Sequence, residues 1–401
     1  MGAQMQHRPA SRSPIVSVVY YGHMAVLSEK SAPTKQELDC TVREATWDDF
    51  EAICQVKQRN GLVPGDRSYW ARLWDENPFR FEHPVPLGWV LENPDLGIVG
   101  TFSNIPRIYF FNGEPIRAAI PSTWAVDRPF RFAASYPAAE FLAQKNIDLF
   151  ITTTASPRTE ARLKELGCLE IPGPSCAQML FWVTNYTRFA SAFLRKVKIP
   201  AAAGIKHAVG SALYLRDLIQ WPKGRFQRVE VNLLQGFDGR FDALWEVLSR
   251  RRNRLMAVRT REALNWQFRP ALETGDLFIF GVMEGDRLTG YLIMRKYDHE
   301  QYGLRRFRVV DLQAIDDEPN TVLSLMVAAL EHGARSGADV VETMGFNKSK
   351  HDLLERLNPH HRTLPSYPYL NKVSGDAPTL QCALLEADAW DPSPLDGDSA
   401  L

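Results

Sequence analysis

The sequence has no excess of charge of either sign and no long uninterrupted apolar run. Its 401 residues contain 47 Lys plus Arg and 47 Asp plus Glu, so no overall basic field would hold DNA. No stretch reaches the roughly 18 to 20 apolar residues that a bilayer span needs. The five cysteines form no CxxC pair and have no histidines at metal-ligand spacing. We therefore expect a cytoplasmic protein without a bound metal and without a disulfide framework.

The chain has the length and composition of a folded protein with more than one core. At 401 residues and 45% hydrophobic content, two packed domains are expected. Residues 1–39 are expected to form a disordered leader, because their short apolar patch at 15–24 is interrupted by Tyr and His and no convincing cleavage site follows it.

The two halves of the chain predict the same order of secondary structure. Periodicity and end signals in the first half predict strand 41–45, helices 47–61 and 68–76, strands 88–92, 97–102 and 116–126, helix 135–144, strand 147–153 and helix 157–166. The second half predicts helices 241–252 and 261–268, strands 277–283, 288–296 and 306–315, helix 321–336, strand 338–344 and helix 351–357. Pro270 is expected to end the helix at 261–268, as Pro78 ends the one at 68–76. Such self-similarity indicates an internal repeat.

Two segments resemble the GNAT acyltransferase superfamily. Residues 70–78, WARLWDENP, are similar to its Trp-rich second helix ending in Asn-Pro, and residues 158–167, RTEARLKELG, resemble the helix before its last strands. The resemblance covers about residues 40–185 and 229–375. It implies an α/β (α+β) fold of two tandem GNAT-like modules, each with a mixed, mostly antiparallel central sheet flanked by helices.

This resemblance divides the chain into five parts. We expect a leader at 1–39, an N-terminal module at 40–187, a basic connector at 188–228, a C-terminal module at 229–375 and an acidic tail at 376–401.

The resemblance implies direct transfer of an acyl group from acetyl-CoA or another acyl-CoA to an amine or, less often, a hydroxyl. In the superfamily a splayed pair of strands holds the pantetheine arm, and small residues in the turn after it let backbone N–H groups reach the pyrophosphate. Here Arg131 and Ala134 match this turn, whereas Tyr136 stands where a small residue is expected. The predicted coenzyme-binding residues are Val126, Arg128, Arg131, Phe132, Ala133, Ala134, Ser135, Thr152 and Thr154.

The corresponding turn of the second half, residues 314–321, has three carboxylates, no glycine and no cation. Negative charges there would repel a pyrophosphate. We therefore expect the first module to bind the acyl carrier and the second to complete the acceptor groove. The alternative is the opposite assignment, because tandem families differ in which copy works.

Acyl transfer needs a base for the amine proton and an acid for the departing thiolate. The Tyr that often supplies the acid in the superfamily is replaced by Leu163 in the first half and Leu354 in the second. The remaining catalytic candidates are Asp127, Thr153 and Tyr136, although an Asp before a helix also caps it and threonines are common strand formers.

Three polar residues on predicted buried strands of the second half are candidates for binding the acceptor: Asp311, Gln313 and Glu342. A buried carboxylate has either a partner or a function. Arg306 and Arg308 are the alternative, purely structural partners.

The connector has nine Lys or Arg residues against a single acid, Asp217, with aromatic and aliphatic residues between them. This pattern is typical of amphipathic helices at a membrane surface, here the inner face, or against an anionic carrier, and equally of a solvated linker. The acidic tail either docks on this connector or extends into solvent.

The leading hypothesis is an acyl-CoA-dependent acyltransferase for a small amine or hydroxyl, such as an amino-sugar or a cell-envelope or polysaccharide precursor. One alternative is a FemAB-like aminoacyl-tRNA-dependent transferase, whose doubled fold needs no pyrophosphate turn. The other is a catalytically inactive GNAT-like binding or scaffold subunit.

Overall fold

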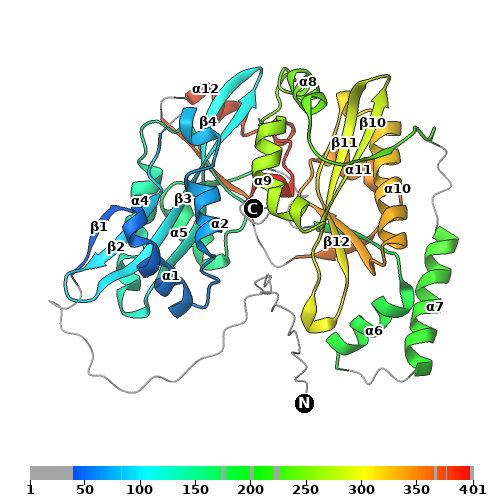
Figure 1. Ribbon diagram of the computed structural model, residues 1–401, viewed down its shortest axis with the longest axis horizontal. Coiled ribbons are helices and arrows are strands. Elements are labelled where there is room, and N and C mark those ends of the chain that lie inside the picture. The colour runs from blue at the N-terminus through cyan, green and yellow to red at the C-terminus, as the bar shows by residue number, and fades with distance from the viewer. Residues whose placement is uncertain are drawn as a thin grey trace, which may run out of the picture.

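The structure, a computed structural model, describes residues 39–82, 84–172, 178–198, 203–220, 226–364, 368–375 and 377–397. Within them the chain forms two mixed, mostly antiparallel sheets flanked by helices, and the sheets lie side by side (Figure 1). This confirms the predicted α/β fold class. Of the predicted leader, only Asp39 is described, and residues 1–38 lie outside the described residues.

The first sheet contains the long strands of the first half. In spatial order its strands are β1 (Thr41–Glu44), β2 (Gly88–Asn93), β3 (Gly97–Phe111), β4 (Glu114–Val126), β5 (Leu149–Thr152), β15 (Leu370–Val373) and β6 (Leu169–Glu170), and β9 (Met256–Ala257) pairs separately with β3. Only β4 and β5 pair in parallel among these described strands.

The second sheet repeats this arrangement. In spatial order its strands are β8 (Asn232–Leu234), β10 (Leu277–Glu284), β11 (Arg287–Lys296), β12 (Arg306–Ala314), β13 (Val340–Met344), β7 (Gln178–Val183) and β14 (His360–Thr363). Its parallel pair, β12 with β13, occupies the place that β4 with β5 occupies in the first sheet.

The halves exchange one strand each. β7, from the first half of the chain, pairs with β13 and β14 of the second sheet. In return β15, from the end of the chain, pairs with β5 and β6 of the first sheet. The predicted boundaries at 187 and 229–375 do not anticipate this exchange, because they assign β7 to the first module and β15 to the second.

Helices flank both sheets (Figure 1). They are α1 (Phe50–Arg59), α2 (Arg67–Trp74), α3 (Phe79–Glu82), α4 (Ser135–Leu142), α5 (Pro157–Glu165), α6 (Tyr186–Lys196), α7 (Ala203–Gln220), α8 (Gly239–Leu248), α9 (Arg261–Glu273), α10 (Pro319–Arg335), α11 (Lys348–Glu355) and α12 (Pro378–Ala383). Helices α2, α8 and α9 lie between the two halves. Local sequence fixes several starts: Asp66, Ser156 and Thr260 accept a backbone N–H of the first turn of α2, α5 and α9. Among the helices described, none combines the length and the apolar character needed to cross a bilayer.

The largest hydrophobic core joins the two halves. It contains Trp70 and Trp74 of α2 together with Phe241 of α8 and Trp266 of α9. The indole of Trp266 also donates a hydrogen bond to the backbone oxygen of Arg72 at 2.8 Å. The interface is therefore packed like the interior of one domain.

The chain after β15 is folded. Residues 389–396 are buried, and the short helical turn η8 (Pro394–Asp396) packs against β12. The expectation that this segment extends into solvent or docks on the connector was wrong: Trp390 and Leu395 are both part of the main core, so their burial offsets the cost of ordering the segment.

Candidate functional site

The two parallel strands of the first sheet pair over a short distance only. Their register joins Ala118 to Leu149 and Ala119 to Phe150. β4 then continues to Val126, while β5 ends at Thr152 and is paired on its other side with β15. Beyond residue 119, no described pairing joins β4 to β5, so backbone groups at the far end of β4 are left for another partner.

The turn that follows β4 is fixed by buried apolar side chains, and its two arginines are exposed. Phe130 and Ala133 are buried against Leu91 and Val99, which fixes the short helical turn η3 (Arg128–Ala133) before α4. Arg128 and Arg131 are exposed, and among the described residues neither has an ion-pair partner. The turn can therefore present two cations and a helix start to an anion.

The other residues predicted at this turn differ in accessibility. Val126 is buried, Ala134 and Ser135 are half-buried, and Phe132 is exposed. Tyr136 is 52% exposed on the first turn of α4. The small side chains of Ala134 and Ser135 at the start of α4 leave room for close approach, whereas Tyr136 does not face the protein interior.

Asp127 is engaged by α1. Its carboxylate accepts a hydrogen bond from Arg59 Nη2 at 2.7 Å and from Asn60 Nδ2 at 2.9 Å. These contacts tie the turn after β4 to the end of α1. Both carboxylate oxygens of Asp127 therefore already have donors.

The matching turn of the second half already contains an anion. The carboxylate of Glu318 accepts hydrogen bonds from the backbone N–H groups of Asn320 at 3.0 Å and Thr321 at 2.6 Å, at the start of α10. Although burial disfavours its charge, these donors hold the pKa of Glu318 below its usual value. A pyrophosphate at this position would meet a fixed negative charge in place of free N–H groups.

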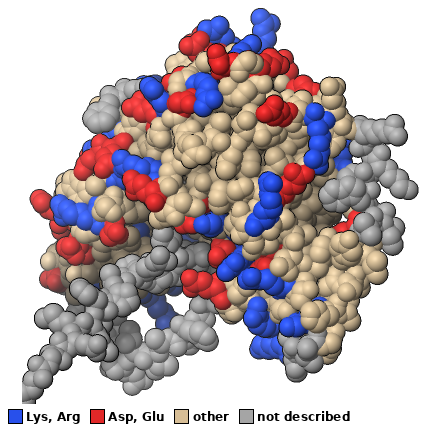
Figure 2. All heavy atoms as spheres, turned by 45° about the vertical axis from the view of Figure 1, so that its right-hand side comes forward, with Lys and Arg blue, Asp and Glu red and all other residues tan. Residues whose placement is uncertain are grey.

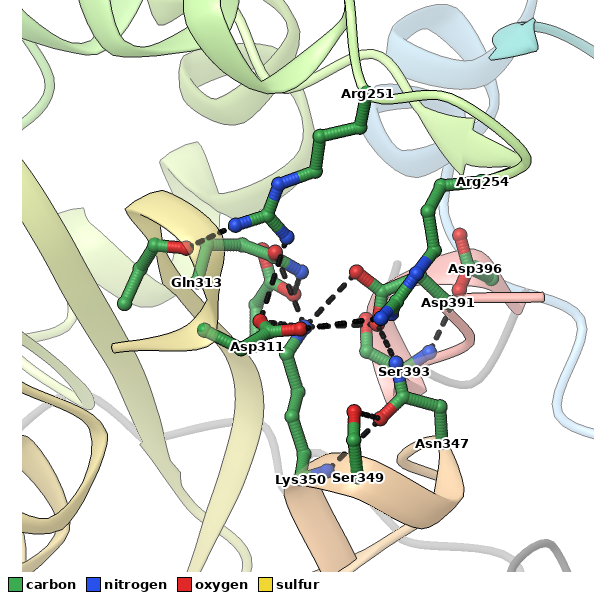
Figure 3. Close-up of polar contacts among 12 residues, drawn as sticks. Arg251, Arg254, Asp311, Gln313, Asn347, Ser349, Lys350, Asp391, Ser393 and Asp396 are labelled. Carbon is green, nitrogen blue, oxygen red and sulfur yellow. Dashed lines mark hydrogen bonds and ion pairs between the residues drawn. The ribbon is translucent and has the colours of Figure 1, made fainter. Parts of the chain in front are cut away.

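The space beyond β12 in the second half is filled by a buried polar cluster (Figure 3). The ammonium of Lys350, on α11, donates to Gln313 at 3.1 Å and to Asp391 at 2.7 and 2.9 Å. Arg259 pairs with Asp311 at 2.8 Å, and Tyr291 donates to the same carboxylate at 2.6 Å. These contacts tie the end of β12, the start of α11 and the C-terminal segment together.

The three residues predicted to bind the acceptor therefore all have protein partners. Asp311 and Gln313 lie together in this cluster and are fully buried. Glu342 has different partners, accepting from Arg308 at 2.6 Å and pairing with Arg306 at 3.5 Å. The purely structural alternative considered for Glu342 matches these contacts.

A small cavity lies where the C-terminal segment meets the end of β5. Thr153, Tyr109 and Asp396 line it, and its volume of about 10 Å³ is about the room for one water molecule. The hydroxyl of Tyr109 and Oδ1 of Asp396 are buried, and neither makes a hydrogen bond of normal geometry within the described part of the chain. Buried polar atoms without partners indicate a site for water or a ligand.

The carboxyl of Asp396 is buried, and its pKa is raised. Burial raises the pKa of its carboxyl from the usual 3.8 to about 6, against the opposing charge of Arg259. Its other oxygen accepts the backbone N–H of Ser393 at 2.7 Å, which fixes the carboxylate. Burial and the neighbouring Asp396 raise the pKa of Tyr109, so that hydroxyl stays protonated and can donate.

Arg107 adds an incompletely paired cation to the same region. It lies two residues before Tyr109 on β3, on the same face of the strand, and only 2% of it is exposed. Its Nη1 donates to Gln267 at 2.9 Å, whereas Nε and Nη2 have no hydrogen-bond partner in the described structure. Burial lowers the pKa of Arg107 to about 10, which still leaves it charged at neutral pH.

The structure thus separates the predicted catalytic candidates. Thr153 shares a cavity with Asp396, while Asp127 and Tyr136 lie at the turn between β4 and α4. Thr152 is buried beside Thr153, and Thr154 is exposed. Among the described residues, no group of His, Cys, Asp and Glu is arranged to hold a metal ion.

Sequence reasoning did not find Asp396, Tyr109 or Arg107. The available signal for Asp396 was Ser393-Pro394-Leu395-Asp396, which has the spacing of a capping box and forms one in the structure. Arg107 and Tyr109 gave a weaker signal, as polar residues at period two in an otherwise apolar strand.

No protein-family model and no curated protein sequence matches the chain. Solved structures do resemble it. A GCN5-related N-acetyltransferase from Anabaena variabilis ATCC 29413 superposes with a TM-score of 0.54 at 13% identity, over 84% of this chain and 73% of that one. One from Kribbella flavida gives 0.52 at 14% identity, over 85% and 72%. A probable N-acyltransferase from Enterococcus faecalis V583 gives 0.53 at 12% identity, over 84% and 73%. The chain therefore has the fold of the GCN5-related N-acetyltransferases.

Proposed function

We propose that the protein is an acyl-CoA-dependent acyltransferase that acts on a small amine or hydroxyl, and that its first half holds the acyl carrier. The observation that carries this proposal is the contrast between two equivalent turns. After β4 the turn exposes Arg128 and Arg131, whereas after β12 the carboxylate of Glu318 already occupies the helix start. In this proposal the halves are two GNAT-like modules, and only the first retains a coenzyme site.

The chemistry is assigned to the region next to the small cavity at Thr153 and Asp396, and the cavity itself has room for one water molecule. The acceptor nitrogen forms a bond to the acyl carbonyl carbon, the carbon–sulfur bond breaks, the proton leaves the nitrogen and the thiolate takes up a proton. Asp396 accepts the first proton through the one water for which the cavity has room. We assign Tyr109 and Arg107, whose buried donors lack a hydrogen bond of normal geometry in the described structure, to the stabilisation of the negative charge that develops on the carbonyl oxygen.

The nature of the acyl chain and the acceptor extends this proposal. Acetyl-CoA is the simplest co-substrate, and amino-sugars or cell-envelope precursors are acceptors of suitable size and chemistry. We place the reaction in the cytoplasm, where acyl-CoA is available.

Coenzyme binding is the first test. Thermal unfolding is measured with acetyl-CoA and longer acyl-CoAs, because a ligand at 100 times its Kd stabilises the folded state by about 2.7 kcal/mol. The melting temperature should rise in the wild type and in Arg250→Glu, a matched exposed arginine of the second half. It should not rise in Arg131→Glu. No rise with any acyl-CoA would contradict the proposal, and salt-dependent tRNA binding would then separate the FemAB-like transferase from the scaffold subunit.

The base is tested by activity. Asp396→Asn keeps the shape and the hydrogen bond from Ser393 but cannot accept the proton, so kcat should fall by about 10²- to 10⁴-fold. Asp388→Asn, an exposed change in the same segment, is the control. In the wild type, kcat/KM should rise as the pH increases through about 6, since only the ionised carboxylate acts as a base. A profile that is flat across this range would exclude Asp396 as the base.

A further inference from the structure

The connector between β7 and β8 forms a two-helix projection at the edge of the molecule. Helices α6 and α7 pack against each other beyond the second sheet (Figure 1). Tyr186 donates to Asp217 at 2.9 Å, and Asp217 also bonds to His360 of β14 at 2.9 Å. Helices α6 and α7 are in close contact at Gly210, because a Cβ added there would lie 3.1 Å from the carbonyl oxygen of Tyr186. The pair is therefore anchored on one side.

The opposite side of α7 is apolar and exposed. Ile205, Ala208, Ala212 and Leu215 are spaced three, four and three residues apart, which places them on one face of the helix. All four are exposed, Ile205 by 44% and Leu215 by 54%. A helix face of this kind is uncommon at a surface that contacts only water.

The loop-facing ends of the two helices combine apolar residues with cations. Phe193 and Val197 at the end of α6 are 49% and 43% exposed. Lys196 and Lys198 lie beside them, and Lys206 lies on the first turns of α7. Among the described residues none of these lysines has an ion-pair partner, and no acidic residue is present between Arg188 and Arg216. In Figure 2 the lower right of the molecule is largely tan, with blue side chains gathered along its lower edge.

We infer that this surface, formed by the exposed residues of α6 and the outer face of α7, docks on a bilayer that contains anionic phospholipid. Apolar side chains at one helix face can enter the acyl boundary while the flanking lysines remain at the phosphates. The charge distribution favours lipid over a second copy of the chain, because a twofold contact through this surface would bring the same lysines together. The inference is independent of the proposed chemistry.

Co-sedimentation of the full chain with lipid vesicles tests the inference. Binding is measured to phosphatidylcholine vesicles with and without phosphatidylglycerol, at low and high salt. The wild type should bind the anionic vesicles, and added salt should weaken binding because it screens the lysines. Replacing both Lys196 and Lys198 by Ala should weaken vesicle binding about 25-fold, because each cation near an anionic surface contributes about fivefold to the affinity.

The apolar contribution is tested by Ile205→Ser combined with Leu215→Ser, which should weaken binding by about tenfold or more. Leu96→Ser combined with Leu385→Ser is the matched control, since these leucines are 68% and 61% exposed elsewhere and should leave binding unchanged. Because all four positions are exposed, the variants should keep the melting temperature of the wild type.

Three results would overturn the inference. The first is that the wild type does not bind anionic vesicles. The second is that the Leu96 and Leu385 control loses as much vesicle binding as the Ile205 and Leu215 variant. The third is that the wild type is a dimer that does not bind vesicles and becomes monomeric in the Ile205 and Leu215 variant. The last result would show that this surface is an interface between copies of the chain.

Discussion

Asp396 carries a charge that the fold disfavours, and this has a measurable thermodynamic consequence. Its pKa of about 6 in the folded state lies above the usual 3.8, so the folded protein binds more protons than the unfolded chain between these pH values. Stability contributed by the protonated carboxyl is complete below about pH 4 and is lost as the pH rises through 6. At pH 7 the ionised, buried carboxylate therefore costs on the order of 3 kcal/mol.

Asp396→Asn should accordingly raise the free energy of unfolding at pH 7, by about 2 kcal/mol after discounting for imperfect replacement of the carboxyl, and change it little at pH 4. Urea unfolding at the two pH values measures this difference. The same variant is expected to lose activity, so a gain in stability with a loss of kcat would identify a residue retained for function. Destabilisation at pH 7 would contradict the assigned pKa shift.

Lys350 is the opposite case, a buried charge that the fold requires. Its ammonium is fully buried against Asp391 and Gln313. Lys350→Ala would leave the buried Asp391 carboxylate without its nearest cation and should cost about 3 to 5 kcal/mol in the free energy of unfolding. Lys348→Ala, two residues earlier, removes an exposed pair with Asp352 and should cost less than about 0.5 kcal/mol. Similar losses in chemical denaturation of the two variants would refute this assignment.

At the scale of elements, the turn after β4 and the turn after β12 differ in one respect. In the second turn a carboxylate already occupies the start of the helix that follows. Glu318 caps α10, so Glu318→Ala should lower the free energy of unfolding by about 1 kcal/mol through loss of two hydrogen bonds. Glu246→Ala, at an exposed position of α8, is the control and should have little effect. Glu318→Ala should not create acyl-CoA binding in the second half, because the Lys350 and Asp391 cluster still fills the space beyond β12. Isothermal titration checks the second point, and a second binding site would disprove it.

The order of elements could be predicted from sequence because it depends on local periodicity, caps and turns. The start of α5 at Ser156-Pro157 and the strand at β4 follow from such signals. The end of α9 did not follow from local signals, because the helix continues through Pro270 to Glu273. Pro270 has no N–H for the Trp266 carbonyl, and Arg72 Nη1 lies 3.5 Å from that oxygen instead. That contact comes from α2, far away in the sequence, and no local pattern reports it.

In the candidate site, too, the residues set by local sequence could be predicted and those set by long-range contacts could not. Arg128 and Arg131 could be found because they follow a predicted strand and begin a helix, which is a local pattern. Asp396 could not, because its role depends on burial against Tyr109 and Thr153, which are more than 240 residues earlier in the printed sequence. The acidic composition of the tail suggested solvent exposure, whereas Trp390 and Leu395 bury it.

At the scale of the whole molecule, the exchange of β7 and β15 makes each sheet depend on both halves of the chain. β7 lies between β13 and β14, so the second sheet loses an interior strand if the first half unfolds. β15 lies between β5 and β6, so the reverse also holds. The largest core likewise draws on α2 from one half and α9 from the other. Each half would therefore expose a strand edge and a hydrophobic face in isolation.

We consequently predict that the two halves unfold in one cooperative transition. Scanning calorimetry should show a single peak whose calorimetric and van't Hoff enthalpies agree, although a chain of 401 residues with two independent domains would normally give two. Lys350→Ala, a change near the second sheet, should shift the entire peak and not only part of it. A fragment of residues 39–172, which lacks β15 and α9, should remain unfolded by circular dichroism. Two resolved transitions, or a folded fragment, would mean that the exchanged strands are accessory and that the first sheet is stable without the second half.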